Sequence, residues 1–98
     1  MVEGIENRTK LAGRIVARQP HPTLGDYDLI TIDVDHVEPV GQFPNLLNVQ
    51  PGGRIEVAVR RELLGEAGMG ARLHCRAKFT PNGPMCEPHP QAGDFTIS

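Results

Sequence analysis

The chain has 98 residues and a formal net charge of −2, and both numbers restrict its class. So short a chain encloses one hydrophobic core, and so small a charge generates no global field that would attract nucleic acid or an anionic membrane. Eleven glycines and nine prolines without a repeat period indicate many turns between short strands, so the composition favours a single β-rich domain.

The first predicted elements are an arm and a bent strand. Residues 1–9 mix charged and polar side chains without a period and are predicted to form a flexible N-terminal arm, while residues 10–98 form a single β-barrel domain. In residues 10–18, apolar or small side chains lie on one face and basic side chains on the other, which is typical of a strand. Gly13 in the middle of this strand indicates a bulge or a sharp bend.

Two further strands are separated by an unusually long connection. Residues 27–37 are rich in β-branched side chains and predict the strongest strand of the chain, with Ile30, Ile32 and Val34 on one face. The connection of residues 38–53 carries apolar side chains between three prolines. Residues 54–60 then alternate cleanly and predict a third strand.

The C-terminal part predicts one short helix and three more extended segments. Helix is expected only within residues 61–69, where glycines limit it to about one turn. Residues 71–79 predict a fourth strand, and Pro81–Gly83 predicts a hairpin turn. Prolines restrict the returning residues 84–90 to an edge strand, and residues 94–98 supply a last short strand.

This order of elements resembles that of OB-type barrels, with a bend glycine in the first strand and a brief glycine-rich connector between the third and the fourth. The resemblance covers about residues 10–98 and implies an all-β fold, a small five- to six-stranded OB-like barrel with at most one short helix. Such barrels bind oligonucleotides, oligosaccharides or proteins, so function has to be argued from sites.

Four side chains of types that bind zinc or copper are His74, Cys75, Cys86 and His89. His74 and Cys75 are adjacent on a predicted strand and therefore point to opposite faces. A hairpin that turns at Asn82 places Cys86 about 10 Å from Cys75, beyond the reach of a disulfide. We therefore favour free thiols, with Cys75 in the core and Cys86 at the surface, and expect no bound metal and no cofactor.

Paired aspartates, Asp33 and Asp35, share a face of the second predicted strand, an arrangement able to hold a hard cation or to divide acid and base roles. Solvated strand faces normally carry such charges, and the first strand offers basic cross-strand partners. The only serine is Ser98, and no nucleophile or phosphate-binding motif is present. The sequence therefore predicts no catalytic residues, and we expect a protein that is not an enzyme.

Basic side chains gather on one face of the first and fourth predicted strands, which are neighbours in an OB-type topology. The candidate anion-binding residues on this face are Arg14, Arg18, Arg72, His74, Arg76 and Lys78. Nucleic-acid binding is one interpretation of this face, and ordinary solvated charge is the other. Rings for stacking on bases are scarce, because the chain has only Tyr27, Phe43, Phe79 and Phe95, and Phe79 is expected to be buried.

The connection of residues 38–53 supplies the candidate partner-binding residues Phe43, Leu46, Leu47 and Val49. Either these side chains fold back and cap the barrel, or part of the connection stays exposed and docks another protein. We expect a non-catalytic binding module that acts through protein contacts or self-association. Nucleic-acid binding and metal binding are the alternatives.

Cellular location follows from what the sequence lacks. The N-terminal segment has no apolar core or cleavage site typical of a signal peptide, and no apolar run is long enough to cross a bilayer. Two cysteines are too few for a secreted disulfide scaffold. We therefore expect a cytoplasmic protein that does not associate with membranes.

Overall fold

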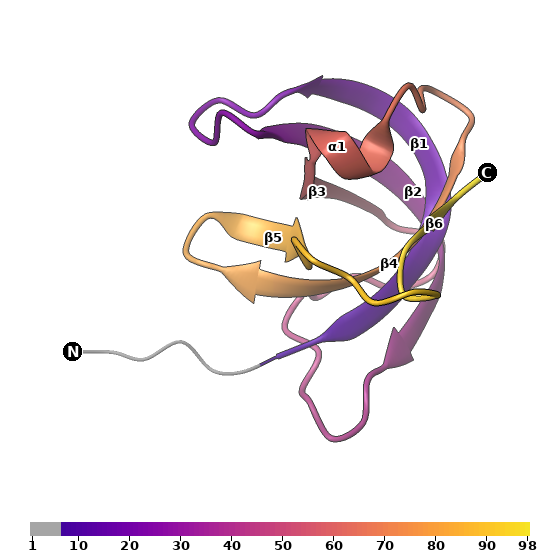
Figure 1. Ribbon diagram of the computed structural model, residues 1–98. Coiled ribbons are helices and arrows are strands. Elements are labelled where there is room, and N and C mark those ends of the chain that lie inside the picture. Colours follow the sequence, from indigo (N-terminus) through magenta and orange to yellow (C-terminus); the bar gives the residue numbers. More distant parts are fainter. Residues whose placement is uncertain (1–6) are drawn as a thin grey trace.

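The computed structural model describes residues 7–98, which fold into a small closed β-barrel (Figure 1). The elements in chain order are β1 (Thr9–Pro20), β2 (Tyr27–Pro39), β3 (Arg54–Arg60), α1 (Arg61–Leu64), β4 (Arg72–Thr80), β5 (Gly83–Cys86) and β6 (Thr96–Ile97). The predicted all-β class, the OB-like order of elements and the single short helix are thereby confirmed. In the described part of the chain, no helix has the length and apolarity needed to cross a bilayer.

Five strands close the barrel in the order β1-β2-β3-β5-β4, and β4 pairs again with β1. Neighbouring strands are antiparallel except β3 and β5, which run parallel and pair through Ala58 and Met85. The sixth strand, β6, pairs with β4 on the same edge as β5. The prediction of an edge strand in residues 84–90 is therefore wrong, because β5 lies between β4 and β3 and closes the barrel.

Two irregularities interrupt the pairing of β1 with β2. The register shifts at Gly13 and again at Val16, so that Asp35 of β2 and Val16 of β1 face no partner residue. At Gly13 the two strands approach so closely that a Cβ atom would overlap the carbonyl oxygen of Asp33. The bend predicted at Gly13 is confirmed, and its cause is this close approach of two backbones.

Aliphatic side chains rather than aromatic rings fill the barrel. The strand residues of the core are Leu11, Ile15, Ile30, Ile32, Val34, Val57, Val59, Leu73, Cys75, Ala77 and Cys86. Leu64 of α1 packs on this core from one end, and Leu47 and Val49 of the β2–β3 connection pack on it as well. Figure 1 shows α1 and that connection at opposite ends of the barrel, so each end has its own plug.

The beginning of the described chain differs from the predicted arm. Residues 1–6 of that arm lie outside the described residues, whereas Asn7 and Thr9 are buried and β1 starts at Thr9. The Asn7 amide donates a hydrogen bond to the Phe79 carbonyl oxygen (3.1 Å) and accepts one from the Phe79 N–H (2.7 Å). The side chain of Asn7 thus continues the pairing of β1 with β4, and this part of the chain belongs to the barrel.

Phe79 is a second difference from expectation. Its side chain is 51% exposed, so the prediction that it is buried is wrong. The pairing of β1 with β4 ends at Thr9 and Ala77, two residues before Phe79. Strand alternation turns Phe79 toward the interior side, but the residue lies beyond the rim where the barrel wall stops.

Candidate functional site

Pairing of β1 with β4 brings most of the predicted basic residues onto one outer face. The register places Lys10 opposite Arg76 and Arg14 opposite Arg72. Like charges that face each other across an antiparallel pair destabilise it unless counter-charges lie nearby. We call this set the basic ladder; its members are Lys10, Arg14, Arg72, His74, Arg76 and Lys78.

Acceptors from both flanks neutralise most of the basic ladder. The contacts are Lys10 with Glu38 at 3.5 Å, Arg76 with Asp94 at 2.8 Å and with Glu87 at 3.9 Å, Arg72 with Asp35 at 2.9 Å, and Arg14 with the Gly70 carbonyl oxygen at 2.8 Å. Among residues 7–98, His74 and Lys78 are the ladder members whose side chains have no such partner. An anion that bound here would have to displace carboxylates, so the ladder is organised as an internal charge network.

Arg18 does not belong to the basic ladder, although the sequence places it among the anion-binding residues. Its guanidinium donates to the Asp28 carboxylate (2.8 Å) and to the carbonyl oxygens of Gly65 (2.9 Å) and Ala67 (2.6 Å). Arg61 of α1 donates to the other carboxylate oxygen of Asp28 (3.0 Å). Arg18 therefore ties β1 to β2 and to the segment after α1, and its role is structural.

Asp28 is the carboxylate that Arg18 and Arg61 share beside α1, and its side chain is only 7% exposed. Burial by itself raises the pKa of this carboxyl, but the hydrogen bonds and positive charges of Arg18 and Arg61 outweigh it and hold the pKa below its ordinary value. A lowered pKa in the folded state contributes stability that is present above the unfolded pKa of about 3.9 and lost as the pH falls through the folded value. The barrel should therefore weaken in acid.

We expect Asp28→Asn to lower the free energy of unfolding at neutral pH by about 2 to 3 kcal/mol, because two guanidinium groups lose their shared counter-charge. Urea denaturation at neutral and at acid pH measures this, and the difference from the parent should shrink in acid, where the parent carboxyl becomes protonated. Asp33→Asn is the matched control, since its pair with Arg54 is exposed, and its stability should stay close to that of the parent. An Asp28→Asn deficit that is equal at both pH values would contradict the charge explanation.

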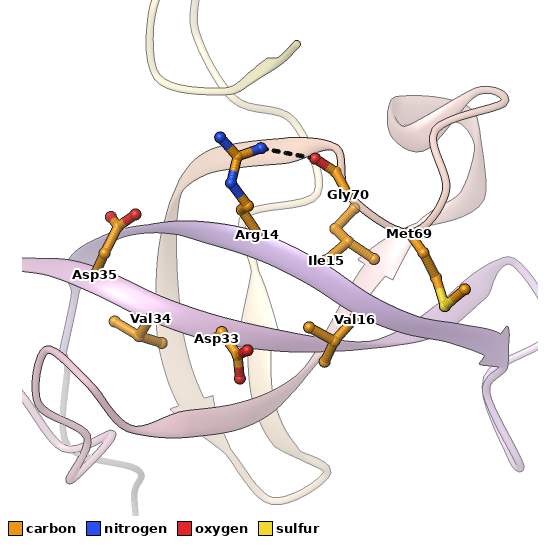
Figure 2. A pocket seen from close by; sticks show the side chains of 8 residues that line it. All are labelled: Arg14, Ile15, Val16, Asp33, Val34, Asp35, Met69 and Gly70. Atoms are coloured by element: carbon orange, nitrogen blue, oxygen red, sulfur yellow. Dashed lines mark hydrogen bonds between the residues drawn. The ribbon is translucent and has the colours of Figure 1, made fainter.

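A surface depression of about 430 Å³ lies where the two irregularities interrupt β1 and β2 (Figure 2). Its lining residues are Arg14, Ile15, Val16, Asp33, Val34, Asp35, Met69 and Gly70. The carboxyl groups of Asp33 and Asp35 point in different directions in Figure 2, and the Arg14 guanidinium reaches across to Gly70. The predicted pair of carboxylates is thus split between two sides of the depression.

Each of these two carboxylates has an arginine partner of its own. The hydrogen bond from Arg54 of β3 holds the pKa of Asp33 below its ordinary value, and that from Arg72 of β4 does the same for Asp35. The sequence suggested partners from the first strand, but the structure supplies them from β3 and β4. A general acid at neutral pH needs a raised pKa, so this pair is poorly suited to divided acid and base roles.

The four predicted metal-ligand types do not converge on one point. His74 lies on the basic ladder, outside the barrel, and His89 lies beside Arg60, with its Nδ1 atom 3.3 Å from the guanidinium. Cys75 and Cys86 lie inside the barrel. Within the described part of the chain, no three residues of the types His, Cys, Asp and Glu are arranged to hold a metal ion.

Cys75 and Cys86 are free thiols as predicted, but the prediction of their separation is wrong. The turn at Pro81–Asn82 pairs Cys86 with Ala77, one residue away from the predicted hairpin register. A shift of one residue moves a side chain to the other face of a strand. Cys86 therefore faces the core instead of the surface, and its sulfur lies 2.9 Å from the sulfur of Cys75.

The structure divides the four predicted partner-binding residues into two groups. Leu47 and Val49 are buried in the core and plug the barrel end. Leu46 is 38% exposed, and Phe43 is half-buried, with the Arg8 guanidinium 4.9 Å from the centre of its ring. Both predicted roles of this connection are therefore present: Leu47 and Val49 cap the barrel, and Phe43 and Leu46 are the two predicted residues that remain at its surface.

The backbone of Phe79 is linked to this connection through Asn7 and Arg8. The Arg8 N–H donates to the Pro44 carbonyl oxygen (3.3 Å), while the neighbouring Asn7 side chain is bonded to the backbone of Phe79. We call Phe43, Leu46 and Phe79 the apolar rim. Phe79 was not among the residues predicted to bind a partner, although its place at the hairpin end of a strand was a signal that the barrel wall stops before it.

The apolar rim and the basic ladder are thus the two surface features on which a function can be argued. One includes the large apolar side chains of Leu46 and Phe79, which are exposed among residues 7–98, and the other consists of charges that are largely paired. Comparison of the chain with protein-family models, with curated proteins and with solved structures finds no match.

Proposed function

We propose that this protein is a non-catalytic, cytoplasmic binding module that acts through protein contacts at the apolar rim. The observation that carries the proposal is the exposure of Phe79 (51%) and Leu46 (38%) at one end of the barrel. Large apolar side chains gathered on one surface are typical of sites that bind other proteins. A partner that buried one of these side chains completely would gain about 1.5 to 3 kcal/mol from it.

The anchoring of the apolar rim also supports a binding role. Asn7 holds the backbone of Phe79 through two hydrogen bonds, and Asn45 accepts a hydrogen bond from the Leu47 N–H (2.9 Å) next to Leu46. Side chains that are held in place before binding lose less conformational entropy when a partner covers them. The rim is therefore a preorganised surface rather than a loose loop.

Nucleic-acid binding through the basic ladder is the second candidate. The direct juxtaposition of Lys10 with Arg76 and of Arg14 with Arg72 favours it, whereas the carboxylates that pair with these groups disfavour it. Each phosphate contact would have to exceed the strength of an existing ion pair. Metal binding is a weaker alternative, because Cys75 and Cys86 meet inside the barrel whereas His74 and His89 lie away from them.

The test is photo-crosslinking in the source cell from benzoylphenylalanine placed at position 79, with the same probe at position 69 as the control. Met69 is 78% exposed and follows α1, so it samples an equally accessible apolar site elsewhere. We expect discrete protein adducts from position 79 that are absent from position 69. Sedimentation equilibrium of the purified chain decides whether the partner is a second copy.

Substitutions then connect the adducts to the apolar rim. Leu46→Asp should reduce their yield about tenfold, as expected for the loss of roughly 1.4 kcal/mol of contact energy, while Met69→Ser leaves the yield unchanged. Identical adducts from both probe positions, or adducts insensitive to Leu46→Asp, would contradict the proposal. Salt-dependent retention on single-stranded DNA that Lys78→Ala weakens would favour the second candidate instead.

A further inference from the structure

Two cysteines from neighbouring strands meet inside the barrel wall. Cys75 of β4 and Cys86 of β5 are 1% and 2% exposed, and their sulfur atoms are 2.9 Å apart. Their register explains the contact, because Cys86 is opposite Ala77 and Cys75 lies two residues from Ala77 on the same face of β4. Diagonal neighbours are usually about 7 to 8 Å apart, and here the two thiols point toward each other so that their sulfur atoms meet.

We propose that Cys75 and Cys86 form a redox-controlled lock, in which oxidation closes a disulfide that ties β5 to β4. This inference is independent of the proposed binding function. It rests on the contact of the two sulfur atoms and on the position of β5, the strand that closes the barrel between β4 and β3.

The reduced pair is protected while the barrel is closed. The hydrogen bond to Cys75, together with burial, raises the pKa of the Cys86 thiol, and thiolates rather than thiols react with disulfides. Cys86 lies on a strand of four residues that pairs with β3 through Ala58 and Met85 alone. Separation of this short strand from β3 would bring Cys86 into water, and we therefore expect Cys86 to react first.

The oxidant is a small-molecule disulfide, and the exchange proceeds in two balanced steps. Cys86 loses its proton to solvent and attacks one sulfur of the small disulfide, so that a mixed disulfide forms and one thiolate departs and takes up a proton. Cys75 then loses its proton, attacks the Cys86 sulfur and releases the second small thiol. Two protein thiols and one small disulfide thus become one protein disulfide and two small thiols.

Closure has a geometric requirement and an entropic benefit. The sulfur atoms must approach from 2.9 Å to a bond length of about 2.05 Å, which the packing of the core has to allow. The bond constrains the unfolded chain between positions 75 and 86, and this lowers its entropy. Oxidation should therefore raise the melting temperature by about 5 to 10 °C.

The experiment equilibrates the whole chain with mixtures of reduced and oxidised glutathione, once in buffer and once in urea that unfolds it. Alkylation followed by mass spectrometry counts internal disulfides, each of which removes two hydrogen atoms. Samples that start reduced and samples that start oxidised are followed until they agree, so slow access to the thiols does not hide the equilibrium. We expect the exchange constant to be at least about tenfold larger for the native chain than for the unfolded chain.

An exchange constant that is equal or smaller in the native state would overturn the proposal, as would a predominance of glutathione adducts or of disulfide-linked dimers. Thermal melts of the oxidised and the reduced parent give an independent reading that requires no variant. Cys86→Ala and Cys75→Ala serve as controls, because each keeps one thiol and should show no rise in melting temperature on oxidation. A rise in either single variant would also overturn the lock.

Discussion

Replacing Gly13 with alanine is expected to lower the free energy of unfolding by more than about 3 kcal/mol, which is a large part of the stability of a small domain. A Cβ atom at this position would overlap the Asp33 carbonyl oxygen and lie 2.7 Å from the Cγ2 atom of Ile32. The first of these neighbours is backbone in the facing strand, so it cannot turn aside as a flexible side chain would. Relief requires β1 and β2 to separate where they are bent.

Urea denaturation followed by circular dichroism measures the loss at Gly13. Gly68→Ala is the matched control, because a Cβ atom at Gly68 has no neighbour within 4 Å and its backbone is outside the left-handed region. The stability of this control should stay within about 0.5 kcal/mol of the parent. Equal stability of the two variants would show that β1 and β2 do not need their close approach.

Leu47→Asp is expected to unfold the barrel or to destabilise it by more than about 4 kcal/mol. Leu47 is 7% exposed and belongs to the core cluster, where it plugs the end opposite α1. The substitution removes an aliphatic side chain from the core and places a carboxylate in apolar surroundings, so the two costs add. Because burial raises the pKa of the introduced carboxyl, the defect should lessen as the pH falls and the group becomes neutral.

Leu46→Asp is the natural control for Leu47→Asp, since the neighbouring side chain is 38% exposed and lies outside the core cluster. Its melting temperature should remain close to that of the parent, while Leu47→Asp should lose the cooperative transition in thermal circular dichroism. Similar melting curves for both variants would contradict the division of this connection into a plug and a surface. The pair thereby separates loss of folding from loss of binding.

Patterns of short range in the sequence predicted the strands and the inward-facing residues. Alternation with a period of two in residues 27–37 and 54–60 placed Ile30, Ile32 and Val57 in the core, where the structure has them. This works because successive side chains of a strand point to opposite faces whatever the strand pairs with. The bend at Gly13 was predictable for a similar reason, because a glycine inside a strand marks a close approach or a bulge.

Features that depend on register between distant segments were not predictable in this way. A hairpin register different by one residue carries Cys86 from the surface to the core and into contact with Cys75. In the β2–β3 connection, alternation alone does not distinguish Leu46 from Leu47, since the burial of each side chain depends on how the connection closes the barrel end.

The local pattern of apolar and polar residues thus determines an all-β barrel with one short helix, because strand alternation and glycine placement act within a few residues. Only the closed barrel decides which charges pair, which end exposes Phe79 and which sulfur atoms meet. The physical reason is that these outcomes depend on the side chains that strand pairing brings together from segments far apart in the chain, and alternation carries no information about such partners.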